Sequence, residues 1–156
     1  MPIPMTICHI VDGQRILLGR KKVRFGVGLW NGFGGKVEPG EDVAAAAVRE
    51  VREECGLRVS QPEHVGSIIV GDERYRAETW QLEVFRATEW NGELAASDEM
   101  EPRWFPLTAV PYAEMWPADR YWLPLLLAGK KFRGRFTFMS ERELAPGHEL
   151  REVPAL

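Results

Sequence analysis

The segment GGKVEPGEDVAAAAVREVREECGL, residues 34–57, restricts the possible folds most, because it joins a glycine-rich turn to a well-defined helix. Ala44–Ala47 are strong helix formers, Asp42 can cap the helix start, and Gly56 suits its end. We therefore expect a helix over Asp42–Cys55. Apolar residues recur at every fourth position of this helix and predict its buried face, which consists of Val43, Ala47, Val51 and Cys55.

The same helix carries three glutamates, Glu50, Glu53 and Glu54, at positions i, i+3 and i+4. This spacing places three carboxylates on one helix face, close enough to share a cation. Mg²⁺ prefers oxygen ligands and completes its shell with water and substrate phosphates, and the preceding glycines let the backbone approach both. Arg49 can hold a glutamate in position through an ion pair. Taken alone, the E-x-x-E-E spacing is most often a solvated face, so the surrounding pattern decides.

The remainder of the chain shows β patterns and one more helix. An Asp12-Gly13 turn predicts an N-terminal hairpin, and the glycine-rich residues 25–41 predict an ordered loop with short strands. A second helix is expected over Ala118–Ala128, in which Pro124 either bends the helix or reduces its hydrogen bonding, whereas the tail, residues 145–156, is undetermined. The expected strands are Met5–Val11, Arg15–Gly19, Arg58–Val59, Val65–Gly71, Glu78–Thr88, residues 100–107 and residues 132–140.

Length and charge indicate one soluble domain spanning residues 1–156 and exclude some partners. The chain has 156 residues, a net charge of −3 and a pI near 5.7, which argue against a general nucleic-acid-binding surface. Two basic clusters, residues 20–24 (RKKVR) and 130–135 (KKFRGR), are expected either to be solvated or to contact phosphates. Two cysteines, no signal peptide and no long apolar run predict a reducing, cytoplasmic location without a membrane partner.

A phosphate-binding P-loop is the natural competitor for a glycine-rich loop that contains a lysine. It fails because Gly35-Lys36 is followed by Val37 instead of Ser or Thr, and because Trp30 stands at the place of the first glycine.

A longer pattern covers both the glycines and the helix. Gly35, Glu41, Arg49-Glu50-Val51, Glu53-Glu54 and Gly56-Leu57 fill every specified position of the Nudix box. Average residue usage makes a chance match in a chain of this length rare, on the order of one in ten million. The chain therefore resembles the Nudix hydrolases, which cleave a nucleoside diphosphate linked to another group. That resemblance implies an α+β fold, with a mixed β-sheet sandwiched between α-helices (an α/β/α sandwich).

The resemblance also implies a cofactor and residue roles. The cofactor would be Mg²⁺, with Mn²⁺ as a substitute, and Glu53 is the first choice for activating water beside it. Arg49 would be structural and Glu41 would orient the loop. The implied catalytic residues are Glu50, Glu53 and Glu54, and the implied metal ligands are Gly34 through its carbonyl, Glu50, Glu53, Glu54 and Glu99.

Other segments are similar to the MutT-homologue purine nucleoside triphosphatases of this family, which remove oxidised nucleotides. These segments are residues 28–41, 97–107, 114–136 and 150–153. The likeness implies a base pocket, in which Trp116 offers a flat apolar face, Phe25 an opposite wall and Asn31 both a donor and an acceptor. The implied substrate-binding residues are Thr6, Lys21, Phe25, Asn31, Trp116 and Asp119.

The chain departs from that subfamily inside the implied pocket. Ala118 replaces the first of two acidic residues that read the base, which leaves Asp119 alone. Trp80 stands where the subfamily has a methionine, and Val70 and Asp72 stand where it has phenylalanines. We therefore expect a reshaped pocket and an altered choice of purine.

The sequence thus predicts a Mg²⁺-dependent hydrolase that converts oxidised or methylated purine nucleoside triphosphates to monophosphate and pyrophosphate. We expect a monomer whose partner is a small-molecule purine nucleotide. Two alternatives stay open: a Nudix hydrolase of another nucleoside diphosphate derivative, and a non-catalytic nucleotide-binding module. The complete set of three glutamates speaks against the second alternative.

Overall fold

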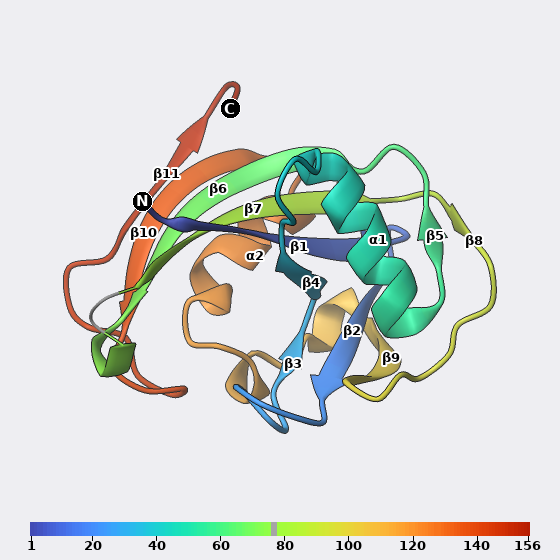
Figure 1. Ribbon diagram of the computed structural model, residues 1–156, viewed down its shortest axis with the longest axis horizontal. Coiled ribbons are helices and arrows are strands. Elements are labelled where there is room, and N and C mark those ends of the chain that lie inside the picture. The colour runs from blue at the N-terminus through green and yellow to red at the C-terminus, as the bar shows by residue number, and fades with distance from the viewer. Residues whose placement is uncertain (76–77) are drawn as a thin grey trace.

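The computed structural model describes residues 1–75 and 78–156, which form a mixed β-sheet with a helix on either side (Figure 1). The helices are α1 (Val43–Cys55) and α2 (Asp119–Leu127), and short 3₁₀ turns cover Glu73–Tyr75, Leu107–Ala109 and Tyr112–Glu114. The strands are β1 (Ile3–Val11), β2 (Arg15–Lys21), β3 (Trp30–Asn31), β4 (Phe33–Lys36), β5 (Arg58–Val59), β6 (Glu63–Asp72), β7 (Thr79–Ala87), β8 (Trp90–Asn91), β9 (Met100–Pro106), β10 (Lys131–Phe138) and β11 (Glu149–Val153).

Strand β1 lies at the centre of the sheet and positions the site. Across the described residues the strand order is β11-β10-β6-β7-β1-β2-β3, with β4 also paired to β1 and β9 to β2. The pairs β1–β7 and β6–β10 are parallel, and the other pairs of this sheet are antiparallel. Strands β5 and β8 form a separate small antiparallel pair. Thr6 and Ile7 pair with both β4 and β7, so the glycine-rich segment is joined directly to the middle of the sheet.

Helix α1 begins and ends where its sequence signals predict. The Asp42 side chain accepts a hydrogen bond from the Ala45 N–H at 3.2 Å, and Gly56 adopts a left-handed conformation with φ 82° that closes the helix. Asp42 is therefore the cap and Val43 the first helical residue. Helix α2 includes Pro124, which has no N–H to donate within the helix and lies exposed at its surface.

Each face of the sheet carries its own core, so the predicted α+β fold with helices on both sides is confirmed (Figure 1). Along β1 the residues alternate: Cys8 and Ile10 pack with α1, whereas Ile7 and Val11 pack in the core that contains α2. The predicted buried residues Ala47, Val51 and Cys55 lie in the α1 core, with Val43 partly buried beside them. Cys8 and Cys55 both carry buried free thiols.

Some elements differ from expectation. The tail forms β11, which pairs with β10, and the sequence left it undetermined because five exposed or half-buried residues give no clear apolar alternation. Strand β8 was not expected, and the last predicted strand ends at Phe138 instead of residue 140. No helix within the described residues is long and apolar enough to cross a membrane.

Candidate active site

Two consecutive glycines let helix α1 lie against the sheet. A Cβ atom on Gly34 would lie 1.8 Å from the Thr6 carbonyl oxygen, and one on Gly35 would lie 2.6 Å from Glu50 Oε1. Neither position therefore has room for a side chain, and β4 can pair closely with β1 while Glu50 approaches its backbone.

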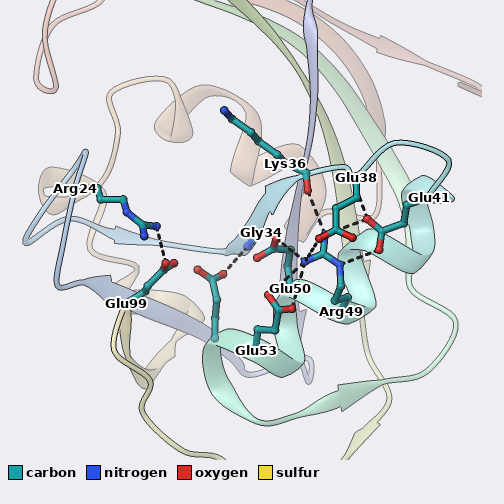
Figure 2. A network of polar contacts seen from close by, with 10 residues as sticks. Arg24, Gly34, Lys36, Glu38, Glu41, Arg49, Glu50, Glu53 and Glu99 are labelled. Carbon is teal, nitrogen blue, oxygen red and sulfur yellow. Dashed lines mark hydrogen bonds and ion pairs between the residues drawn. The ribbon is translucent and has the colours of Figure 1, made fainter.

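Arg49 organises the acidic side chains of this region (Figure 2). Its Nε donates to Glu41 at 2.8 Å, and its Nη1 donates to Glu50 at 3.0 Å and to Glu53 at 3.3 Å. Its Nη2 donates to Glu41 at 3.0 Å and to the Lys36 carbonyl at 3.2 Å. The hydrogen bond from Arg49 holds the pKa of the Glu41 carboxyl below its usual range. The Arg49 guanidinium thus connects Glu41, in the loop before the helix, to Glu50 and Glu53 on the helix. Arg49 therefore acts as a structural link and Glu41 as an anchor of the loop, as expected from the sequence.

Glu54 faces the opposite side of this group and is buried, with 4 % of its surface exposed. It accepts a hydrogen bond from the Gly34 N–H at 2.8 Å. Burial raises its pKa to about 8, with further contributions from the negative charges of Glu50 and Glu99, while Lys21 acts in the opposite direction. Burial also raises the pKa of Glu50, although Arg49 opposes this. These interactions place Glu50, Glu54 and Glu99 within electrostatic range of one another.

Glu99 reaches the site from the loop before β9. It forms an ion pair with Arg24 at 2.6 Å, on the side of Gly34 away from Arg49 (Figure 2). The sequence did not single out Arg24, although it lies in the basic cluster 20–24, and only the fold brings that cluster to Glu99.

The chemistry of these groups fits a hard divalent cation. The side chains of the proposed ligands are all carboxylates, and a cation between them would offset the burial and repulsion that raise the pKa values of Glu50 and Glu54. Among the residues that the structure describes, no three His, Cys, Asp or Glu side chains are already arranged to enclose a metal. Glu50 and Glu53 are bonded to Arg49, and Glu54 to Gly34. Mg²⁺ needs only one or two protein carboxylates when phosphates and water supply the rest.

A cavity of about 490 Å³ extends from this carboxylate group into the α2 side of the sheet. At one end it is lined by Gly34 and Glu54, and at the other by Trp122 and Ala118. Every residue that the sequence assigned to the substrate lines it, namely Thr6, Lys21, Phe25, Asn31, Trp116 and Asp119. The structure therefore brings together residues from β1, β2, β3, α2 and the loops that precede them.

The cavity is also lined by residues whose buried polar atoms have no hydrogen-bond partner among the described residues. Asp119 is 4 % exposed, and its Oδ2 has no hydrogen-bond partner among the described residues. Burial raises the pKa of Asp119 to about 8, so at neutral pH its carboxyl can donate as well as accept. Thr6 Oγ1 is also buried without a partner in the described part of the chain. Asn31 accepts from the Gly32 N–H at 2.9 Å, and Trp116 packs on Phe138 with ring centroids 5.1 Å apart.

The residues that depart from the subfamily all line this cavity. Ala118 is buried directly before α2, and Val70 pairs with Trp80 across β6 and β7. Asp72 is bonded to Arg74, whose Nε and Nη2 donate at 3.0 and 2.8 Å. This ion pair was missed, because nothing in the local pattern distinguishes it from a solvated turn. Other lining residues that were not singled out are Met5, Ile7, Lys36, Ile68, Glu78, Leu82, Met100 and Phe138.

Comparisons with known proteins agree with this geometry. A family model described as the NUDIX domain matches residues 2–126. An oxidized purine nucleoside triphosphate hydrolase from Danio rerio is 42 % identical over 97 % of this chain and 96 % of its own length. The protein of the same name from Mus musculus is 44 % identical, over 95 % of this chain and 94 % of its own length. The crystal structure of a MutT protein from Bacillus halodurans superposes with a TM-score of 0.82 at 30 % identity, covering 99 % of both chains.

Proposed function

Because this chain belongs to the Nudix hydrolase family, we propose that it hydrolyses oxidised or otherwise modified purine nucleoside triphosphates, such as 8-oxo-dGTP, to the monophosphate and pyrophosphate. This activity would remove damaged nucleotides from the cellular pool. One observation carries the proposal: a single cavity is lined both by Glu54, from the carboxylate face of α1, and by the aromatic and carboxyl groups around α2. A nucleotide needs this arrangement, since its phosphates and its base must be held at opposite ends.

Members of this family use divalent metal cations. We propose Mg²⁺, replaceable by Mn²⁺, held by the Gly34 carbonyl and by carboxylates of Glu50, Glu53, Glu54 and Glu99. A bound cation would neutralise phosphate charge and orient the phosphorus for in-line attack.

Among the three helix glutamates, Glu53 is best placed to accept a proton from water. Its side chain is 58 % exposed, although it accepts a 3.3 Å hydrogen bond from Arg49, whereas the side chain of Glu50 is 14 % exposed and Glu54 is buried and bonded to the Gly34 N–H at 2.8 Å. Glu53 would take the proton as the water oxygen bonds to phosphorus and the bridging P–O bond breaks, releasing pyrophosphate. Arg49 would keep Glu50 and Glu53 in position and would not contact the reacting atoms.

At the inner end, Asp119 and Asn31 would recognise the purine edge. The protonated Asp119 carboxyl offers one donor and one acceptor, and the Asn31 amide offers both kinds of group. Trp116 would stack on the base, and Phe25 would close the mouth. A site that must hydrogen-bond its ligand rejects bases lacking the matching groups, because its own buried polar atoms would stay unpaired.

The proposed partner is a small-molecule purine nucleotide bound by a monomer of one domain, residues 1–156, in the cytoplasm, without a nucleic-acid or membrane partner. The two free buried thiols support a reducing location.

The test is a panel of normal, oxidised and methylated nucleoside triphosphates, assayed for pyrophosphate and for phosphate, with Mg²⁺ and with a chelator. We expect pyrophosphate, only with metal, and faster from modified purines. Equal rates for purines and pyrimidines, or release of phosphate alone, would contradict the proposal.

A further inference from the structure

Strands β10 and β11 form one edge of the sheet and lie away from α1 (Figure 1). A second groove lies on these strands. It has a volume of about 500 Å³ and shares no lining residue with the nucleotide cavity. We call it the arginine groove; its lining residues are Ile69, Arg133, Gly134, Arg135, Glu149, Leu150 and Arg151.

Three like charges meet in the arginine groove. Arg133 and Arg151 are direct partners in the antiparallel register of β10 and β11, and Arg135 follows on the same face, opposite Glu149. Directly opposed like charges destabilise a sheet, so the Arg133–Arg151 pair lowers the stability of the fold when no ligand is bound.

None of the three guanidinium groups is neutralised within residues 1–75 and 78–156. No carboxylate of these residues lies within 4.0 Å of them, and none of the three has an ion pair or hydrogen bond there through its side chain. By contrast, Lys130 in the same basic cluster pairs with Glu152 at 3.5 Å, and Arg86 pairs with Glu63 at 3.1 Å. The arginine groove is therefore a local positive site in a chain whose net charge is −3.

Another carboxylate on the same sheet face, that of Glu83, already has hydrogen-bond partners. Glu83 lies two strands away from Arg133, in the row that passes through Ser67. It accepts hydrogen bonds from Ser67 at 2.9 Å and from Gln81 at 2.8 Å, and it contacts His64. Among the described residues that line the groove, Glu149 alone is acidic and stands against three arginines, so the groove suits a ligand with several negative charges.

We propose that the arginine groove is a second binding site for an oligophosphate group, carried by free pyrophosphate or by the phosphate tail of a nucleotide. Guanidinium groups bind phosphate oxygens through two parallel hydrogen bonds, and neighbouring arginines on two strands can contact adjacent phosphates of one ligand. Among the described residues, no aromatic side chain lines the groove, so a base finds no ring there on which to stack. Binding is thus independent of the base, and single-stranded nucleic acid is disfavoured.

The experiment uses pyrophosphate as the probe, in metal-free buffer at low salt, with calorimetry and backbone amide shifts as readouts. We expect shifts in β10 and β11, and binding that weakens as salt is added. The double variant Arg133→Gln/Arg151→Gln should lose affinity by about tenfold or more. The matched control is Arg58→Gln/Arg120→Gln, which removes the same charge at exposed positions elsewhere and should stay within about twofold.

Further arms identify the source and class of the ligand. Nucleoside triphosphates with different bases should bind the groove alike, and orthophosphate more weakly than pyrophosphate. Arg133→Lys/Arg151→Lys keeps the charge but loses the planar guanidinium, which can form two parallel hydrogen bonds, so it should bind pyrophosphate with intermediate affinity. This variant also replaces the glutamine variant if the latter fails to fold.

The inference is overturned if Arg133→Gln/Arg151→Gln and the control Arg58→Gln/Arg120→Gln bind pyrophosphate with the same affinity. It is also overturned if amide shifts occur only around the nucleotide cavity, or if an oligonucleotide binds more tightly than pyrophosphate. The inference does not rest on the proposed hydrolysis. Groove binding without turnover would contradict the proposed function alone, and turnover without groove binding would contradict this inference alone.

Discussion

The two ends of the nucleotide cavity are built in opposite ways. At the α1 end every carboxylate has a hydrogen-bond partner, including the buried Glu54: Arg49 holds Glu41, Glu50 and Glu53, and the Gly34 N–H holds Glu54. At the α2 end Asp119 lies buried with an oxygen that has no partner within the described residues. The first end is a self-consistent ionic network, whereas the second leaves hydrogen-bonding capacity for a ligand.

This difference assigns the handling of phosphates to the α1 end and the choice between bases to the α2 end. The ionic end suits any polyphosphate, because phosphates and cations are the same in every nucleotide. The α2 end can discriminate, because a base that leaves the buried Asp119 carboxyl unpaired forfeits the hydrogen bonds that burial makes valuable. The positions at which this chain departs from the subfamily, among them Ala118, Trp80 and Asp72, all line the cavity.

The largest effect on turnover is expected at the ionic end, from Glu53→Gln. This change removes the proposed base but keeps the size of the side chain, so kcat should fall by about 10²–10⁴-fold while unfolding is unchanged. Steady-state kinetics and thermal unfolding measure the two effects. Glu89→Gln makes the same change at an exposed site and should leave kcat intact; activity of Glu53→Gln within tenfold of wild type would remove Glu53 from the role of base.

The next largest effect is expected on stability, from a substitution at Gly34, where β4 packs against β1. Gly34→Ala would place a Cβ 1.8 Å from the Thr6 carbonyl oxygen, where neither backbone can move freely. We expect a loss of about 3 kcal/mol or more in the free energy of unfolding, measured in urea. Gly71→Ala is the control, since the added Cβ meets no atom closer than 3.6 Å. Similar stabilities of the two variants would show that β4 does not depend on this close approach.

The pH dependence of stability tests whether Asp119 is buried and protonated at the α2 end of the cavity. Folding raises the pKa of Asp119 from 3.8 to about 8 through burial, so the folded state favours its protonated form. This group therefore contributes most to stability below about pH 4, and the contribution is lost as pH rises toward 8, on the order of a few kcal/mol. Urea unfolding at pH 5 and pH 8 should show a smaller loss with rising pH for Asp119→Asn than for wild type. Parallel losses would mean that Asp119 is not buried in solution.

A gain of function would test the selecting end more directly. Ala118→Asp restores a second carboxyl beside Asp119, and we expect acceptance of additional purines, with relative kcat/KM for at least one changed by about tenfold. The buried carboxyl should also lower stability by about 1–3 kcal/mol. An unchanged purine profile would mean that position 118 does not select the base.

The smallest effect is expected for Arg24→Gln, which releases Glu99. The Arg24 side chain is 70 % exposed, and an exposed ion pair contributes at most about 1 kcal/mol. Stability measured in urea should therefore change little. A large loss would place Arg24 in the structural network with Arg49.

The sequence predicted the α1 end better than the α2 end, because the interactions at the α1 end join residues that are close in the sequence. Helix α1, its caps and its carboxylate face depend on residues within a few positions of one another, and their placement was predicted from local pattern alone. The cavity depends on β1, β6, β7 and α2 meeting in space, so its residues were named through family resemblance and not through spacing. The Arg24–Glu99 pair and β11 were missed, because each owes its position to the tertiary fold. The Asp72–Arg74 pair is local, and it was missed because its sequence pattern does not differ from that of a solvated turn.

The most direct test of the central claim is a crystal structure with Mn²⁺ and a purine nucleotide, using the anomalous signal of manganese to locate the ion. We predict a peak in coordination contact with carboxylate oxygens of Glu50, Glu53 and Glu54 and with the phosphates, and a base beside Trp116 and Asp119. A manganese peak elsewhere, with these glutamates facing solvent, would contradict the account.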